Sequence, residues 1–258
     1  TTDLGAIRFR TRELRLDSCL YLVDARQSLH FQQLFVTARK AGWLPLDAHY
    51  EHVGHGMVMG DDGRPLKTRS GENVKLVDLL DEAVERAFQL VSAKNPDLPE
   101  ASRRDIASAV GIGALKYADL SKNRNTDYIF DWDAMLSFEG NSAPYLQYAY
   151  TRVRSIFRKA GQWDAAAPIT ISTSAEHVLA LELARFADVV YQVARDSQPH
   201  FLCAYLYNVA TAFSRFFEAC PVIENGIANP SRLKLCDATG KTLATGLGLL
   251  GINVLEAM

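Results

Sequence analysis

Cationic and hydroxyl side chains gather in one loop, residues 60–71, which has glycines at both ends. It contains Lys67 and Arg69 together with the hydroxyl groups of Thr68 and Ser70. Groups of this kind can hold a polyphosphate and stabilise negative charge that develops on it. A solvated basic loop has the same composition, so the loop by itself leaves both interpretations open.

A second group of residues suited to binding lies between positions 145 and 152. Tyr145, Tyr148 and Arg152 are spaced so that they share one face of a helix. Two aromatic rings and a guanidinium on an exposed face can stack unpaired bases, at about 1–3 kcal/mol per base. Ordinary packing of both tyrosines is the alternative that the spacing leaves open. Further cations for phosphate groups follow on the same helix at Arg154, Arg158 and Lys159.

Metal and disulfide chemistry are not expected. His49, His52 and His55 are three residues apart, a spacing that would suggest a metal site on a helix. The stretch is interrupted by glycines and is strand-like, so successive histidines should point to opposite faces. The four cysteines form no C-x-x-C pair and are expected to be reduced thiols: Cys19, Cys203, Cys220 and Cys236.

The elements that must carry these residues change in kind near residue 95. An apolar run at 19–24 is typical of a buried parallel strand, and extended segments are expected at 51–53 and 57–59. Helices are expected at 28–41 and 75–94, then, after a proline-marked linker at 95–100, at 103–120, 144–160, 174–196, 200–219 and 230–250. The inward residues should be Leu29, Phe31, Leu34, Phe35 and Ala38 in the first helix, Leu76, Leu79, Leu80, Ala83, Ala87 and Leu90 in the second, and Leu146, Ala149, Val153 and Phe157 at 144–160. This order indicates an α/β part followed by an all-α part.

The composition is that of a globular protein with a large core. Of 258 residues, 48% are hydrophobic and 22% charged, and the formal net charge is −2. Because this charge gives no overall attraction for a polyanion, any nucleic acid must be held by a local patch. No apolar stretch approaches the roughly 18–20 residues that a membrane span needs, so no membrane association is expected.

Several segments in combination resemble arginyl-tRNA synthetases. They are residues 1–6 with 23–33, 53–58 with 67–71 and 74–83, 110–124, 137–152 and 248–258. The resemblance implies the second half of a class I Rossmann-type catalytic domain, followed by an α-helical-bundle anticodon-binding domain. Residues 1–100 would be the catalytic part with the phosphate loop, 101–136 a helical stem and 137–258 the anticodon-binding domain.

The family activates L-arginine with ATP and Mg²⁺ to an arginyl-adenylate and then esterifies it to its cognate tRNA(Arg). By this resemblance, Asp3 binds the substrate guanidinium and Gln27 also contacts the bound arginine. A carboxylate can accept two parallel N–H bonds from a guanidinium, which agrees with that role. Gly56, Met57 and Val58 match the segment whose backbone lies against the ATP adenine.

The phosphate loop departs from the usual class I signature. Residues 65–69 stand where other class I enzymes carry Lys-Met-Ser-Lys-Ser, and Thr68 replaces the lysine credited with stabilising the transition state. Lys67 and Arg69 are the cations left for catalysis, with Lys67 and Thr68 also expected to bind ATP. Which cation takes over the role of the missing lysine stays open.

The resemblance also assigns the contacts with the anticodon loop. Phe213 aligns only roughly, so Phe216 or Phe217 is an alternative. Lys116, Lys122 and Arg124 could line the inner side of the tRNA. The expected anticodon-binding residues are Tyr145, Tyr148, Arg152, Phe213 and Met258.

The other class I signature, His-x-Gly-His, has no match in these residues. We therefore expect a fragment of a cytoplasmic, monomeric ligase without a tightly bound cofactor, inactive when isolated. The alternative is a stand-alone, non-catalytic tRNA-binding module derived from a synthetase. Retention of Asp3, Gln27 and the loop at 67–71 favours the enzyme, because a binding module has no use for them.

Overall fold

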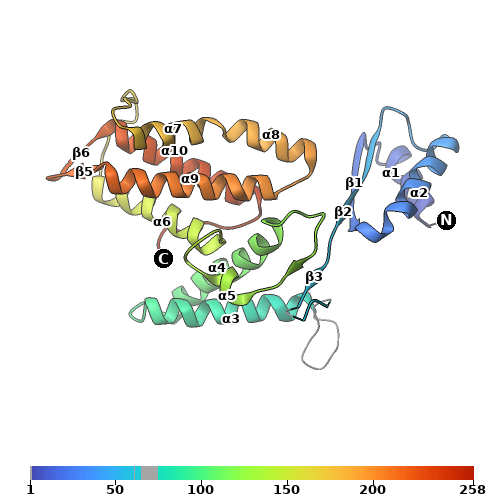
Figure 1. Ribbon diagram of the computed structural model, residues 1–258, viewed down its shortest axis with the longest axis horizontal. Coiled ribbons are helices and arrows are strands. Elements are labelled where there is room, and N and C mark those ends of the chain that lie inside the picture. The colour runs from blue at the N-terminus through green and yellow to red at the C-terminus, as the bar shows by residue number, and fades with distance from the viewer. Residues whose placement is uncertain (1, 61, 65–74) are drawn as a thin grey trace. The chain divides into compact units, whose positions relative to one another are not determined.

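The protein is described from a computed structural model that covers residues 2–60, 62–64 and 75–258 (Figure 1). The chain divides into two compact units. The first consists of Thr1–Pro65 and Asn123–Ile129, and the second of Leu66–Lys122 and Phe130–Met258. The phosphate loop with Lys67, Thr68 and Arg69 lies outside the described residues.

The first unit is a small α/β assembly. Strands β1 and β2 are parallel, with Ser18 opposite His49 and Asp24 opposite His55. The later strand β4 returns to pair in parallel with β3. In chain order the elements are α1 (Thr2–Arg12), β1 (Ser18–Asp24), the 3-10 helix η1 (Ala25–Gln27), α2 (Ser28–Lys40), β2 (His49–His55), β3 (Val58–Met59) and β4 (Tyr128–Ile129).

Helices α1 and α2 cover one face of the β1–β2 pair. Apolar residues of these helices, of the loop after α2 and of β2 form a buried core: Ile7, Phe31, Leu34, Ala38, Leu44, Ala48 and Tyr50. The prediction of a strand at 19–24 is confirmed, but its burial is one-sided, since Leu20 and Leu22 are 52% and 68% exposed. The alternation of a pleated strand explains this, because Cys19, Tyr21 and Val23 take the covered side. In α2, Leu29 was wrongly placed inward and is 63% exposed.

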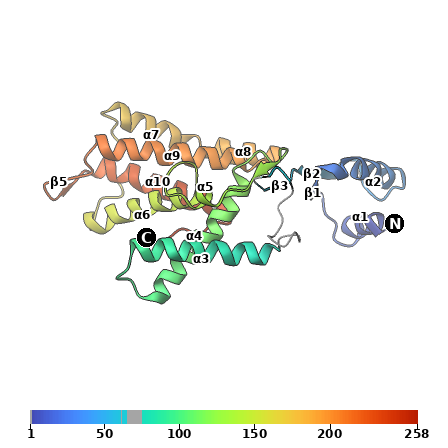
Figure 2. The ribbon, with the colours of Figure 1, turned by 60° about the horizontal axis from the view of Figure 1, so that its bottom comes forward.

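The second unit is helical. Figures 1 and 2 show α6, α9 and α10 lying side by side, with α7 and α8 along them. The elements are α3 (Leu76–Lys94), α4 (Glu100–Leu120), α5 (Trp132–Leu136), α6 (Ala143–Ala160), α7 (Ser174–Ala184), α8 (Phe186–Asp196), α9 (His200–Ala219), β5 (Ile223–Glu224), β6 (Ile227–Ala228) and α10 (Pro230–Leu249). No helix within these described ranges is long and apolar enough to cross a membrane.

Local sequence signals explain where several of these helices begin. The Ser142 hydroxyl accepts from the Tyr145 amide at the start of α6, and Pro144 stands in the first turn. Thr173 and Glu176 form a capping box at the start of α7. The single helix expected at 174–196 is instead two, because the Arg185 amide bonds to the Glu182 carbonyl and tightens the chain there.

Small residues set the packing of α3 against α4. A Cβ on Gly111 would lie 2.5 Å from the Ala83 carbonyl oxygen, so only glycine allows this approach. Ala83, Ala87 and Val91 are buried, whereas Leu76 is exposed. The prediction that a leucine stripe lines the inner face of this helix is therefore wrong for Leu76 and Leu90, since the close contact selects the alanines.

We expect Gly111→Ala to destabilise the protein by about 1–3 kcal/mol, because the added methyl group must push α3 and α4 apart. Gly248→Ala is the matched control: it is also helical, and a Cβ there meets nothing within 4 Å. Alanine at 248 should be neutral or stabilising by up to about 1 kcal/mol. Urea unfolding of both variants measures the difference, and equal midpoints would contradict the packing described here.

Candidate functional site

The carboxyl ends of β1 and β2 lie at one edge because the strands are parallel and Asp24 stands opposite His55. Ligands of open α/β sheets bind at this kind of edge. Beyond it the chain continues into η1 after β1 and into Gly56 after β2. An ideal Cβ on Gly54 would lie 3.2 Å from the Ala25 Cα, so η1 packs directly on the end of β2.

Asp3 and Gln27 are brought to this edge. Gln27 ends η1, is exposed, and precedes the first residue of α2. The Asp3 Oδ2 atom lies 3.0 Å from Nε2 of His30, one turn further along α2. Both side chains of this pair are about half exposed, so the contact adds little stability. It does orient the carboxylate, and sequence analysis overlooked His30 although it lies three residues after Gln27.

One ion pair fixes charge beside these residues. Arg26 donates from Nε and Nη2 to the Asp24 carboxylate, with Nη2 2.6 Å from Oδ2. Hydrogen bonding to the Arg26 side chain and amide lowers the pKa of Asp24 to about 2. The carboxylate is therefore ionised at neutral pH. Its negative charge is balanced by the positive charge of Arg26.

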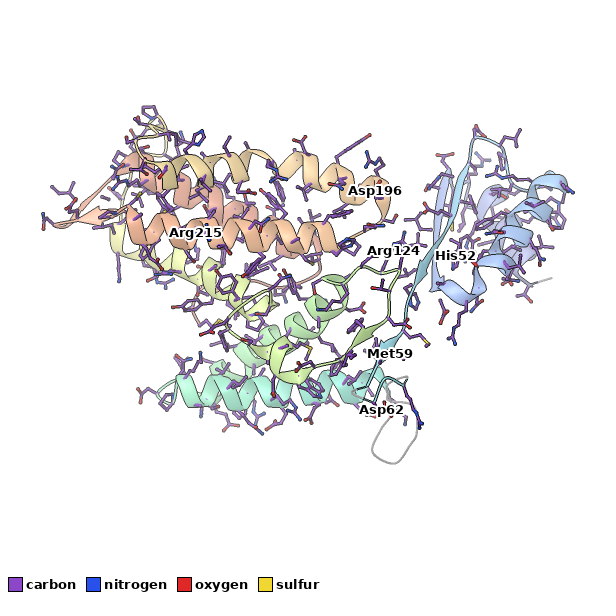
Figure 3. All side chains as sticks on the ribbon, viewed as in Figure 1. His52, Met59, Asp62, Arg124, Asp196 and Arg215 are labelled. Carbon is purple, nitrogen blue, oxygen red and sulfur yellow. The ribbon has the colours of Figure 1, made fainter. Side chains whose placement is uncertain are left out.

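The segment 56–58 is held by a distant part of the chain. The Gly56 amide donates to the Arg124 carbonyl at 2.7 Å, and the Met57 amide donates to Oδ1 of Asp127 at 2.7 Å. Arg124 lies along the stretch between His52 and Met59 (Figure 3). Of the three amides expected near a nucleotide, those of Gly56 and Met57 thus have internal partners.

The histidines of β2 have other contacts than a metal. His52 donates from Nε2 to the Val23 carbonyl at 2.9 Å and stacks on Phe31, with ring centroids 4.6 Å apart. His49 pairs with Glu51 at 3.1 Å. Within the described ranges no three metal-binding side chains form a group that could hold an ion.

The cysteines are free thiols, as expected. Burial raises the pKa of Cys203 and of Cys236 to about 12. Both therefore stay protonated at neutral pH and act as small core residues.

Of the three residues expected to share an exposed face of α6, Tyr145, Tyr148 and Arg152, two have close aromatic neighbours. Tyr148 is 48% exposed, whereas Tyr145 is half-buried and packs against Tyr207 with ring centroids 5.7 Å apart. The Arg152 guanidinium lies 4.3 Å from the ring centroid of Phe217 on α9. This cation–π contact places the Phe217 ring next to Arg152. The core stripe at Leu146, Ala149 and Val153 is confirmed.

Phe213 is not on that face. Its ring is 0% exposed and lies between Phe216 and Phe217, with centroids 6.2 and 6.1 Å away. A buried ring has no free surface for a base, so we transfer the expected stacking role to Phe217, which is half-buried.

Arg154 and Arg158 both bond to the chain's own end, although the Arg154 side chain stays 43% exposed and Arg158 is exposed. Arg154 donates from Nε to Oε2 of Glu256 at 2.8 Å, and Arg158 donates to the Glu256 carbonyl at 2.8 Å. Gln147 similarly donates to the Asn253 carbonyl at 2.8 Å. The last residues therefore run along α6, and Met258 is half-buried. No sequence signal had marked Glu256.

Two family models match consecutive parts of the chain, and the first of them also takes in helices α3 and α4. "tRNA synthetases class I (R), catalytic domain" matches residues 1–132, and "DALR anticodon binding domain" matches residues 146–258. The fold and site thus define part of a class I tRNA synthetase with an anticodon-binding domain. The chain belongs to the arginyl-tRNA synthetase family.

Full-length relatives and solved structures agree with this. The chain is 65% identical to an arginine–tRNA ligase of Laribacter hongkongensis and 61% identical to one of Chromobacterium violaceum, covering all of this chain and 45% of each relative. An arginyl-tRNA synthetase structure from Plasmodium falciparum superposes on it with a TM-score of 0.83 and 30% identity, covering 100% of this chain and 44% of that chain. One from Thermus thermophilus superposes with a TM-score of 0.79 and 34% identity, covering 94% of this chain and 41% of that chain. The chain spans about half the length of these proteins.

We expect Phe213→Ala to cost about 3–5 kcal/mol of unfolding free energy, because it empties a fully buried site. Phe217→Ala, at the neighbouring half-buried ring, should cost about 1 kcal/mol. Urea unfolding of the two variants compares them directly. An equal, small loss for both would show that Phe213 is accessible and restore it as a base-stacking candidate.

Proposed function

We propose that the protein carrying this chain ligates L-arginine to tRNA(Arg), with MgATP as co-substrate and arginyl-adenylate as intermediate. The observation that supports this most is the gathering of Asp3, Gln27 and the segment 56–58 around the carboxyl ends of β1 and β2. Each has a family-assigned role toward arginine or ATP. Gln27 and residues 56–58 follow the ends of the paired strands, and Asp3 bonds to His30 in the first turn of α2.

Arginine recognition is proposed to rest on Asp3. A guanidinium donates parallel N–H bonds, and an ionised carboxylate accepts them with charge assistance. The bond to His30 occupies Oδ2 from one side and restrains the plane of the carboxylate. Gln27 adds neutral acceptor and donor atoms next to it. Lys67 and Arg69 are proposed to act on the phosphates, and Lys67 and Thr68 to bind ATP.

Anticodon recognition is proposed for the α6 face. Tyr148 offers an exposed ring, and Arg152 with Phe217 forms a second flat surface. Tyr145 and Met258 would border them. Because Arg154 is paired with Glu256, we propose that it positions the chain end rather than neutralising phosphate.

We propose three functional regions: residues 1–100 for arginine and ATP, 101–136 as a stem, and 137–258 for the anticodon. The whole protein would act in the cytoplasm as a monomer. The chain alone supplies only part of the arginine and ATP site and is proposed to be inactive by itself.

With tRNA(Arg) present, isolated residues 1–258 should show no arginine-dependent ATP–pyrophosphate exchange, whereas a protein of the relatives' full length that includes them should show it. Adenylate formation needs both halves of the site around the reactants, since misplacement by about 1 Å can cost 100-fold. Exchange by the isolated chain would contradict the fragment proposal. Absence of exchange in the longer protein would favour the non-catalytic RNA-binding module.

In that longer protein, Tyr148→Ala, Tyr145→Ala and Arg152→Ala should each weaken tRNA(Arg) binding by about 5- to 150-fold, the equivalent of about 1–3 kcal/mol per stacked base. Tyr191→Ala is the control, because Tyr191 is a highly exposed tyrosine on α8. Filter binding across a salt series measures the effect. If Arg152 stacks on a base, its loss should leave the salt slope almost unchanged. Binding equal to that of Tyr191→Ala for all three variants would exclude this face.

A further inference from the structure

We propose that Arg124 and Asp127 are positioning residues for the nucleotide. They fix the backbone of residues 54–57 so that the Val58 peptide, on the opposite side of β3, reads the adenine edge. This inference rests on the proposed function, since it names the residues that shape its ATP site. Both residues belong to segment 123–129, between α4 and α5.

Arg124 holds the segment on both sides of His55. Its carbonyl accepts from the Gly56 amide at 2.7 Å, and its Nη1 donates to the Gly54 carbonyl at 2.7 Å. The His55 ring lies 2.8 Å from the Gly56 carbonyl through Nδ1. The peptide groups flanking His55 therefore have fixed partners, and this stretch cannot rotate without breaking bonds that involve a charged group.

Asp127 fixes the next peptide. Its Oδ1 accepts from the Met57 amide at 2.7 Å, a short bond of the kind that an ionised acceptor makes. The Tyr128 amide then donates to the Met57 carbonyl at 3.1 Å. Met57 is thus held at both its N–H and its C=O by consecutive residues of the same segment.

The fit between the two segments requires glycine at position 56. A Cβ there would lie 2.5 Å from the Thr126 carbonyl oxygen and 2.8 Å from the Asp127 nitrogen. Backbone atoms cannot move away as a flexible side chain can, so residues 54–57 and 123–127 are fitted to each other. Such close backbone approach is one of the few uses for which a glycine is needed.

The remaining peptide follows from the geometry of the ladder. Val58 pairs with Tyr128 and Met59 with Ile129 in parallel. In this pattern Met57 and Met59 direct peptide groups toward β4, so Val58 directs its N–H and C=O to the opposite side. Adenine presents a donor at N6 next to an acceptor at N1. One residue's C=O and N–H match that pair, which makes Val58 the adenine-reading peptide.

The test uses the protein of the relatives' full length and compares Asp127→Ala, Asp127→Asn and the control Asp97→Ala, an exposed aspartate in the α3–α4 loop. Equilibrium dialysis gives the affinity for ATP and for inosine triphosphate, which lacks the N6 donor. We expect Asp127→Ala to weaken ATP about tenfold and inosine triphosphate much less. Asp127→Asn keeps an acceptor oxygen and should recover most of the preference, while Asp97→Ala matches the parent.

Asp3→Asn separates this inference from the proposed function. It should raise the KM for arginine about tenfold or more and leave the ATP preference intact, whereas Asp127→Ala should do the reverse. Loss of both nucleotides in parallel, or an unchanged preference for ATP in Asp127→Ala, overturns the positioning role. An unchanged arginine KM in Asp3→Asn overturns the arginine site alone, because the nucleotide measurement needs no arginine.

Discussion

Parallel pairing of β1 with β2 is the constraint on which the candidate active site depends. It brings the chain after Asp24 and the chain after His55 to the same edge, and their two continuations supply Gln27 and the segment 56–58. Helix α2 then places His30 beside Asp3 of α1. Without this register, Gln27 and residues 56–58, which are far apart in the sequence, would not lie at the same edge.

Periodicity in the sequence predicted elements well where one face packs on a large core. The strand at 19–24 follows from its apolar run, the start of α6 from Pro144, and the stripe at Leu146, Ala149 and Val153 from helical spacing. Periodicity failed where one neighbouring residue determines which face of a helix is buried. In α3 the inner face is chosen by Gly111 of α4, and a single-sequence pattern that favours leucine has no information about that glycine.

In the candidate site, too, some residues could be predicted from the sequence and others could not. Asp3, Gln27 and the α6 face were predicted from residue types and resemblance, and these roles remain proposals. The partners of those residues were not predictable: His30, Asp127, Phe217 and Glu256 matter through contacts across the fold. Phe213 shows the opposite error, since an aromatic in the right region of the sequence can still be wholly buried. The pairing of Arg154 with Glu256 was likewise not predictable from charge counts.

The unit that contains residues 54–58 is assembled from two stretches of chain, with α3 and α4 encoded between them. During translation the first stretch leaves the ribosome while residues 123–129 do not yet exist. Translation proceeds at about 5–20 residues per second, so several seconds separate the synthesis of Gly56 and Met57 from that of their bonding partners. These partners are the Arg124 carbonyl and the Asp127 carboxylate. Helices α3 and α4 can pack against each other in that interval, because their contacts need no later part of the chain. The order of synthesis therefore makes residues 56–57 one of the last parts of their unit to become native.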